Sequence, residues 1–276
     1  MYLLLVNPKA GNQRYRRIEP ALKRLLDKEE IKYNTVLIDD LVNVDDLLKQ
    51  HVTGQTKAVV AVGGNGTVNA IIDALADYED LPLAVIPISQ SNHLANILGV
   101  RSWQTGARLL SDHTTKHLRL GKIGERYFAG SLLISPKRHL LASIFEKQNL
   151  IKKFLGVNLK QLAKEEHQVA CTLTLDHRLT IRCQLSTMVV HFQDGFGKKI
   201  KVQLQTANAQ KKKPEDSVLR ANHVEVSSSL NMPVICGNES VAHTPLKIQA
   251  IGQTLPVLAP VSKTKKGAGQ TFDEPK

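Results

Sequence analysis

Short apolar runs alternate with amphipathic segments over the first 115 residues. Four runs predict strands, at residues 2–6, 34–38, 58–62 and 83–88. Between and after them, apolar residues at helical spacing predict helices at residues 14–28, 44–50, 68–75 and 94–98. Strands that are apolar throughout and alternate with helices predict an α/β domain, a parallel sheet with helices on both faces.

The pattern changes after about residue 117. Short β-type segments separated by turn residues follow, at 169–175, 179–185, 187–192, 200–206, 223–226, 234–236, 246–250 and 254–258. Such spacing is typical of an antiparallel sandwich or barrel, of which we predict an all-β sandwich; residues 140–162 are expected to be partly helical. We therefore predict an α/β domain over 1–116, a β-sandwich domain over 117–261 and a disordered basic tail over 262–276. The pattern leaves open whether the last strand returns to the first domain.

The apolar run at 58–62 leads into the most informative segment, Gly63-Gly64-Asn65-Gly66-Thr67. Glycines let a ligand approach the backbone closely, and the N-terminus of the helix that follows offers N–H groups to a phosphate. Thr67 is expected to cap that helix or to bond a phosphate oxygen. An ordinary turn would explain one such glycine, but the cluster favours ligand binding.

Two further turns follow neighbouring strands. The first is Asn7-Pro8-Lys9-Ala10-Gly11, and the second runs from Pro87 through Ser91 and Asn92 to His93. Taken singly, each is an ordinary turn or helix cap. In a doubly wound sheet, however, the loops at the carboxyl ends of neighbouring strands converge on one crevice. We therefore expect the three turns to meet at a ligand site.

The three turns resemble the NPxSG, GGDGTxNE and PxGTxND motifs of the diacylglycerol kinase catalytic family, which includes bacterial lipid kinases and sphingosine kinases. Weaker similarity at 126–128 and 234–260 extends the resemblance over nearly all of 1–261. It implies a cleft between two domains that holds ATP and a lipid, with Glu239 as the base near the lipid hydroxyl. It also implies a nucleotide site made of Asn7, Pro8, Gly11, Gly63, Gly64, Gly66, Thr67, Asn69, Ser91 and Asn92.

Several acids of the family pattern are replaced. Asn65 and His93 stand in place of aspartates, and Arg220 and Ala221 stand where the family has a metal-linked acidic pair. Magnesium prefers anionic oxygen ligands, so Mg²⁺ as a cofactor is weakly supported and its ligands are not identified. Asn65 keeps the shape of an aspartate at a catalytic position but would serve poorly as a base. These changes predict a slow or inactive enzyme.

The net charge of +12 favours polyanionic partners: nucleic acid, nucleotides or an anionic membrane surface. With only 4% aromatic residues and no basic–aromatic pattern, nucleic acid is disfavoured. Basic runs at 152–153, 198–201 and 211–213 are either a membrane-facing surface or solvated loop lysines. No apolar stretch approaches the roughly 20 residues of a membrane span. Three cysteines without CxxC spacing fit the reducing conditions of the cytoplasm. We expect a cytoplasmic protein that attaches peripherally to the membrane, and a homodimer is left open.

Three functions are therefore compatible with the sequence. The first is an ATP-dependent lipid kinase that phosphorylates a hydroxyl such as that of diacylglycerol. The second is a non-catalytic (pseudokinase) nucleotide- or lipid-binding module, suggested by the replaced acids. The third is an NAD kinase-like enzyme, which shares the glycine turn, although the Asn7-Pro8 and Asn92 turns fit the lipid branch better.

Overall fold

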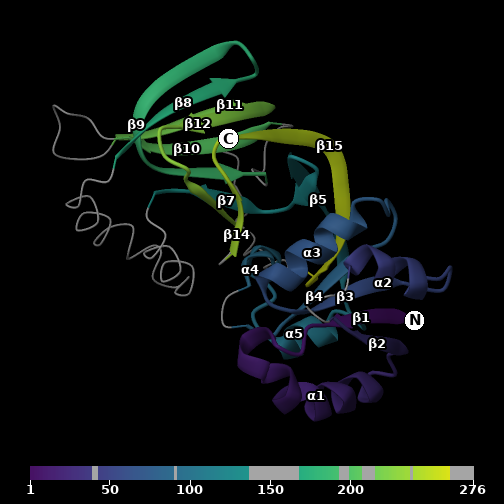
Figure 1. The fold of residues 1–276 in the computed structure, drawn as a ribbon. Helices are drawn as coiled ribbons and strands as arrows, with labels where there is room; N and C mark the ends of the chain where they lie inside the picture. The colour runs from purple at the N-terminus through teal and green to yellow at the C-terminus, as the bar shows by residue number, and fades with distance from the viewer. Residues whose placement is uncertain are drawn as a thin grey trace, which may run out of the picture.

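A computed structural model describes residues 1–38, 43–89, 92–136, 168–192, 199–206, 215–236 and 239–261. An α/β part carrying the N-terminus lies beside a strand-rich part (Figure 1). The strands of the α/β part are β1 Tyr2–Val6, β2 Tyr33–Leu37, β3 Ala58–Gly63 and β4 Leu83–Pro87. Its helices are α1 Ala10–Lys28, α2 Val44–His51, α3 Asn65–Leu75, α4 His93–Leu98 and α5 Trp103–Arg108. The strands pair in parallel, as the apolar runs predicted, and their order is β2-β1-β3-β4.

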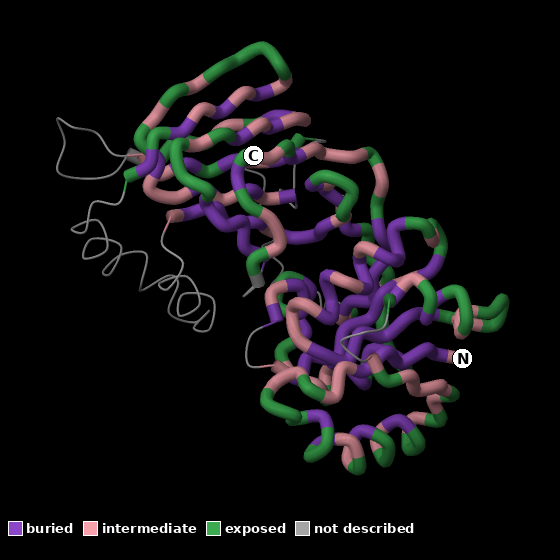
Figure 2. The backbone as a smooth tube through the Cα atoms, in the orientation of Figure 1, coloured by how far each residue is buried: buried purple, intermediate pink, exposed green. Residues whose placement is uncertain are grey.

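Apolar side chains cover both faces of this parallel sheet. Leu3 and Leu5 of β1 share one core with α2, α3 and α4, whereas Leu4 and Val6 share another with α1 and α5. Alternate residues of one strand point to opposite faces, so a strand buried on both faces must be apolar throughout. Figure 2 shows β1, β3 and β4 buried along their length.

The strand-rich part contains β5 Thr114–Ile123, β6 Arg126–Phe128, β7 Ser131–Ile134, β8 Val169–Leu175, β9 Leu179–His191, β10 Ile200–Thr206, β11 Glu215–Ala221, β12 His223–Ser228, β13 Pro233–Cys236, β14 Glu239–His243 and β15 Leu246–Ala259. Its strands pair antiparallel around one core, in which Phe128, Met188 and Val224 are buried. Sequence predicted this all-β part, and the structure has it. Five elements were not predicted: β5, β7, β11, β14 and α5.

Strand β15 joins the two parts. Val257 pairs in parallel with Leu83 of β4, while the antiparallel partners of β15 are β5 and β12. The last strand therefore does return to the α/β sheet, the question that the sequence left open. Strand β5 runs through residue 116 without a break, and the division of the chain into domains at that residue stays a prediction.

Two pairs of predicted strands are single long strands. The predicted segments 179–185 and 187–192 form one strand, β9, which ends at His191, and the predicted segments 246–250 and 254–258 belong to β15. A shift in register between Ala250 and Thr254 marks the interruption that looked like a turn. The predicted helical segment 140–162, the tail and the lysine runs 152–153 and 211–213 lie outside the described residues. In the part of the chain that is described, no helix has the length and apolarity to span a bilayer.

Candidate functional site

The three turns singled out in the sequence meet at the carboxyl edge of the parallel sheet. The Asn7 N–H donates to the carbonyl oxygen of Val62 (3.0 Å), and the Ile88 N–H donates to that of Gly63 (3.2 Å). Gly11 has a φ of +60°, and a Cβ at this position would overlap the carbonyl oxygen of Ile88. The first turn therefore contacts the third directly, and both are bonded to the end of β3, where the glycine turn begins.

The N-terminus of α3 is open to a ligand. Gly64 is its N-cap, no side chain caps it, and its first turn contains no acid. The first N–H groups of a helix lack internal partners and, with the helix dipole, favour an anion. Because α3 begins at Asn65, three residues earlier than a cap at Thr67 requires, the predicted capping role of Thr67 is wrong. Thr67 is instead buried, with its side chain packed over Gly63.

Asn65 ties the glycine turn to α4. Its Oδ1 accepts the backbone N–H of His93 at 2.7 Å. Asn92, the N-cap of α4 as predicted, accepts the Ala95 N–H at 3.0 Å. The described residues include no group of three or more His, Cys, Asp or Glu side chains placed to hold a metal. These residues therefore fit Mg²⁺ poorly, since its preferred ligands are anionic oxygens.

A second contact brings the strand-rich part to α3. The Cys236 thiol, at the end of β13, donates to Oδ1 of Asn69 at 3.5 Å. Cys236 pairs with Glu239, the first residue of β14, so the backbone of the predicted base lies one strand away from the α3 contact. The Glu239 side chain, Ser91 and residues 237–238 lie outside what the structure describes. Asn69 is 7% exposed, and its Nδ2 finds no acceptor among the described residues.

Arg220 and Ala221, which align with the family's acidic pair, are the last two residues of β11 in the strand-rich part. Ala221 is fully buried in the core of that part. The N–H groups of Asn222 and His223 both donate to Oδ1 of Asp176, in the turn between β8 and β9. The His223 N–H lowers the pKa of Asp176, because it stabilises the charged carboxylate. This carboxylate is thus engaged in holding the corner between β11 and β12.

A polar chain that sequence reasoning missed lies beside α4. Nδ1 of His191 is 2.7 Å from Oγ of Ser131, and its Nε2 is 2.7 Å from Oε1 of Gln203. An amide oxygen only accepts, so the Nε2–H of His191 donates to Gln203. The three residues come from β7, β9 and β10, too far apart in sequence for any motif to show.

His93 faces this chain from α4. The pKa of His93 is lowered, mainly because burial disfavours its charged form and secondly because of the charge of His191. Gly130, with a φ of +93°, packs on the His93 ring, and a Cβ there would lie 3.0 Å from Cδ2. A neutral imidazole thus occupies the place of a family aspartate.

The buried His93 predicts an acid-labile fold. A histidine whose pKa is lowered by folding takes up its proton more readily in the unfolded chain. Stability should therefore be full above the ordinary pKa of about 6.5 and should fall as the pH drops below it. We expect the urea midpoint of the wild type to decrease between about pH 7.5 and about pH 5.5 more than that of His93→Gln. His117→Gln, at an exposed position of β5, is the control; equal decreases in all three proteins would contradict the prediction.

The parallel sheet with its glycine turn is joined to an antiparallel β part in a two-part fold that resembles the fold of bacterial diacylglycerol kinases. Residues 1–123 match the family described as the diacylglycerol kinase catalytic domain. The chain is 28% identical over 162 residues to a diacylglycerol kinase of Staphylococcus haemolyticus (55% of this chain, 46% of that protein). It is 20% identical over 156 residues to one of Bacillus subtilis (55% and 50%). The matches thus span about half the length of these curated relatives.

Solved structures extend the likeness to almost the whole fold. A Bacillus anthracis structure superposes with a TM-score of 0.73 at 16% identity, covering 94% of this chain and 96% of that chain. Another, described as a diacylglycerol kinase of the same organism, gives a TM-score of 0.63 at 17% identity with the same coverage. These comparisons confirm the resemblance carried by the three turns. At such identities the structural matches establish the fold alone.

Proposed function

We propose that this protein is an ATP-dependent lipid kinase-like protein with weakened catalysis, which acts on a lipid hydroxyl such as that of diacylglycerol. The observation that carries the proposal is the uncapped N-terminus of α3, which opens from the glycine turn where three loops meet. The kinase relatives support it. The lipid would be met at an anionic membrane surface, which the charge of +12 favours.

Phosphoryl transfer depends on positioning and on neutralising charge at the phosphates. In our proposal the N–H groups of Gly64, Asn65 and Gly66 cradle the nucleotide phosphates, helped by the positive end of the α3 dipole. Glu239 would accept the proton of the lipid hydroxyl as that oxygen attacks the γ-phosphate and ADP leaves. The described residues add no protein ligand set for magnesium, so we assign no step to the metal.

A non-catalytic nucleotide- or lipid-binding module is the alternative, and one contact favours it. The Asn65 side-chain oxygen is already engaged by the His93 N–H, and both residues replace family acids. A turn tied to α4 in this way can still offer its backbone N–H groups to phosphate. The contact is therefore compatible with phosphate binding by the turn, although Asn65 and His93 replace acids that the family uses for catalysis.

Two measurements on the purified protein test the proposal. Calorimetric titration of ATP, with and without magnesium, measures nucleotide binding. Transfer of labelled γ-phosphate to diacylglycerol and to sphingosine measures kinase activity, with NAD as a third acceptor to test the NAD kinase-like reading. Binding with slow lipid labelling supports the proposal. Binding without any labelling supports the non-catalytic module, and absence of ATP binding would rule out both.

Restoring one acid should make nucleotide binding depend on magnesium. In Asn65→Asp the carboxylate keeps the acceptor for the His93 N–H, so the turn should fold unchanged. Its negative charge should repel the phosphates without metal and bind Mg²⁺ when it is present. We expect the ratio of ATP affinities with and without magnesium to rise at least about tenfold, or about 1.4 kcal/mol. Asn34→Asp, at the amino end of β2, is the charge-matched control, and an unchanged ratio in Asn65→Asp would refute the expectation.

A further inference from the structure

A small cavity lies beside the glycine turn, between α4 and α5. It has a volume of about 170 Å³ and is walled by residues of the β4 turn, α4, the α4–α5 link, α5 and the start of α1. Its polar lining consists of arginine, asparagine, serine and glutamine side chains, with no carboxylate from the described residues. The volume is below the roughly 300–1,000 Å³ of pockets for drug-sized ligands. The cavity therefore suits a small, acceptor-rich group.

Asn92 gives the first reason to expect a ligand there. Its side chain lines the cavity and is only 3% exposed. Its Oδ1 is used, because it accepts the Ala95 N–H, but its Nδ2 finds no acceptor among the described residues. A buried donor without a partner costs about 1–3 kcal/mol. An oxygen atom bound in the cavity would remove that cost.

Two arginines give the second, independent reason. Arg14 of α1 and Arg101 of the α4–α5 link both line the cavity and are exposed at its rim. Neither forms an ion pair with a residue in the described ranges. A guanidinium presents a planar fork of donors that matches a phosphate or carboxylate. Two unpaired guanidiniums around a cavity without carboxylates favour an anion.

We propose that this cavity is a second anion site, which binds one phosphate group carrying a small substituent. It differs from the α3 site in two of its elements, since α1 and α5 pack on the opposite face of the sheet from α3, while α4 and its cap Asn92, a residue of the predicted nucleotide site, adjoin both sites. The two sites share a wall, because the Ser89 side chain lies 3.5 Å from the place of a Cβ on Gly64. The phosphate comes either from a free phosphate ester or from a phospholipid headgroup.

The experiment separates these sources and the two sites. Binding of glycerol phosphate is measured by calorimetry, and binding to phosphatidylcholine vesicles with and without phosphatidic acid is measured by co-sedimentation. Both are repeated with ATP present to fill the α3 site. The variants are Arg14→Gln with Arg101→Gln, and Asn92→Asp, which keeps the helix cap and replaces the unpaired donor by a charge. Arg108→Gln, an exposed arginine of α5 outside the cavity, is the control.

We expect the control to bind like the wild type and both cavity variants to lose at least about tenfold in affinity for one probe, or about 1.4 kcal/mol. Loss for glycerol phosphate identifies a free ester as the ligand, and loss for phosphatidic acid vesicles identifies a headgroup. If neither probe binds the wild type, or if the cavity variants bind both probes as well as the control does, the proposal is wrong. Failure of ATP binding alone would count against the proposed function and leave this comparison intact.

Discussion

Replacing Gly63 by alanine is expected to remove most nucleotide binding with the addition of one carbon atom. Gly63 ends β3 and is buried, and a Cβ there would overlap the Thr67 side chain in the first turn of α3. Because β3 is paired on both sides, the helix start must move instead of the strand. Overpacking of this kind costs about 1–3 kcal/mol. The displaced N–H groups of α3 would then no longer converge on a phosphate.

We expect the ATP affinity of Gly63→Ala to fall at least about tenfold, or about 1.4 kcal/mol, together with a lower urea midpoint. Gly54→Ala is the matched control, because a Cβ at Gly54 meets nothing within 4 Å. Calorimetry measures the first effect and chemical denaturation the second. If Gly63→Ala bound ATP like Gly54→Ala, phosphate would not bind at the N-terminus of α3, and the proposed function would lose its main support.

Local patterns in the sequence were enough to predict the α/β half of the fold. The run at 58–62 is apolar throughout because β3 is buried on both faces, and few other structures produce that pattern. The helix predicted at 94–98 is α4, which the Asn92 side chain caps and which Gly99 ends with a φ of +80°. Apolar runs and helix caps depend on only a few neighbouring residues, so they can be recognised without knowledge of the tertiary contacts.

Elements stabilised by distant partners were missed. Strand β11 is polar and exposed over much of its length, and among the described strands it pairs with β10 alone. It therefore has no apolar run from which a strand could be predicted. Strand β5 begins with exposed polar residues and owes its length to its pairing with β15. Because β propensity depends on such neighbours, the sequence alone could not define either strand.

The same limit applies to the candidate site. The loops at the carboxyl ends of neighbouring parallel strands converge, and this rule correctly predicted that the three turns would meet. The bond from His93 to Asn65 joins residues 28 apart, and the Ser131–His191 contact joins residues 60 apart. The first bond depends on the meeting of two turns and the second on the pairing of β7 with β9, so neither partner could be assigned from the sequence alone.

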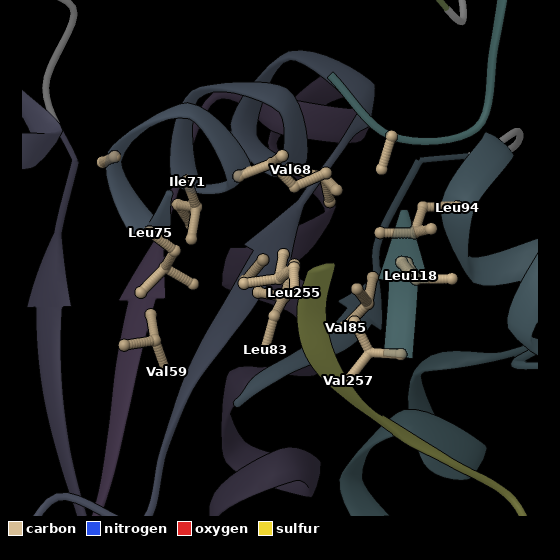
Figure 3. Packing of buried hydrophobic residues seen from close by; sticks show 14 of the residues in the cluster. Val59, Val68, Ile71, Leu75, Leu83, Val85, Leu94, Leu118, Leu255 and Val257 are labelled. Atoms are coloured by element: carbon tan, nitrogen blue, oxygen red, sulfur yellow. The ribbon is translucent and has the colours of Figure 1, made fainter. Parts of the chain in front are cut away.

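Strand β15 makes the α/β sheet depend on the end of the chain, and its burial predicts the largest loss of stability. Val257 is fully buried between β4 and β5, and Figure 3 shows it with Leu255 beside Leu83 and Val85 under α3. An aspartate at position 257 would place an unpaired charge in this core. Such changes can cost more than about 4 kcal/mol, a large part of the roughly 5–15 kcal/mol that stabilises a folded protein.

We therefore expect Val257→Asp to be mostly unfolded at room temperature by circular dichroism. Leu255→Ala should lower the free energy of unfolding by about 2–5 kcal/mol, which gives a graded measurement in a protein that still folds. Val261→Asp is the matched control, since Val261 is 52% exposed just beyond the strand, and its effect should stay within about 0.5 kcal/mol. If Val257→Asp and Val261→Asp were equally stable, the α/β sheet would not need β15. The nucleotide site would then belong to a unit that folds without the last strand.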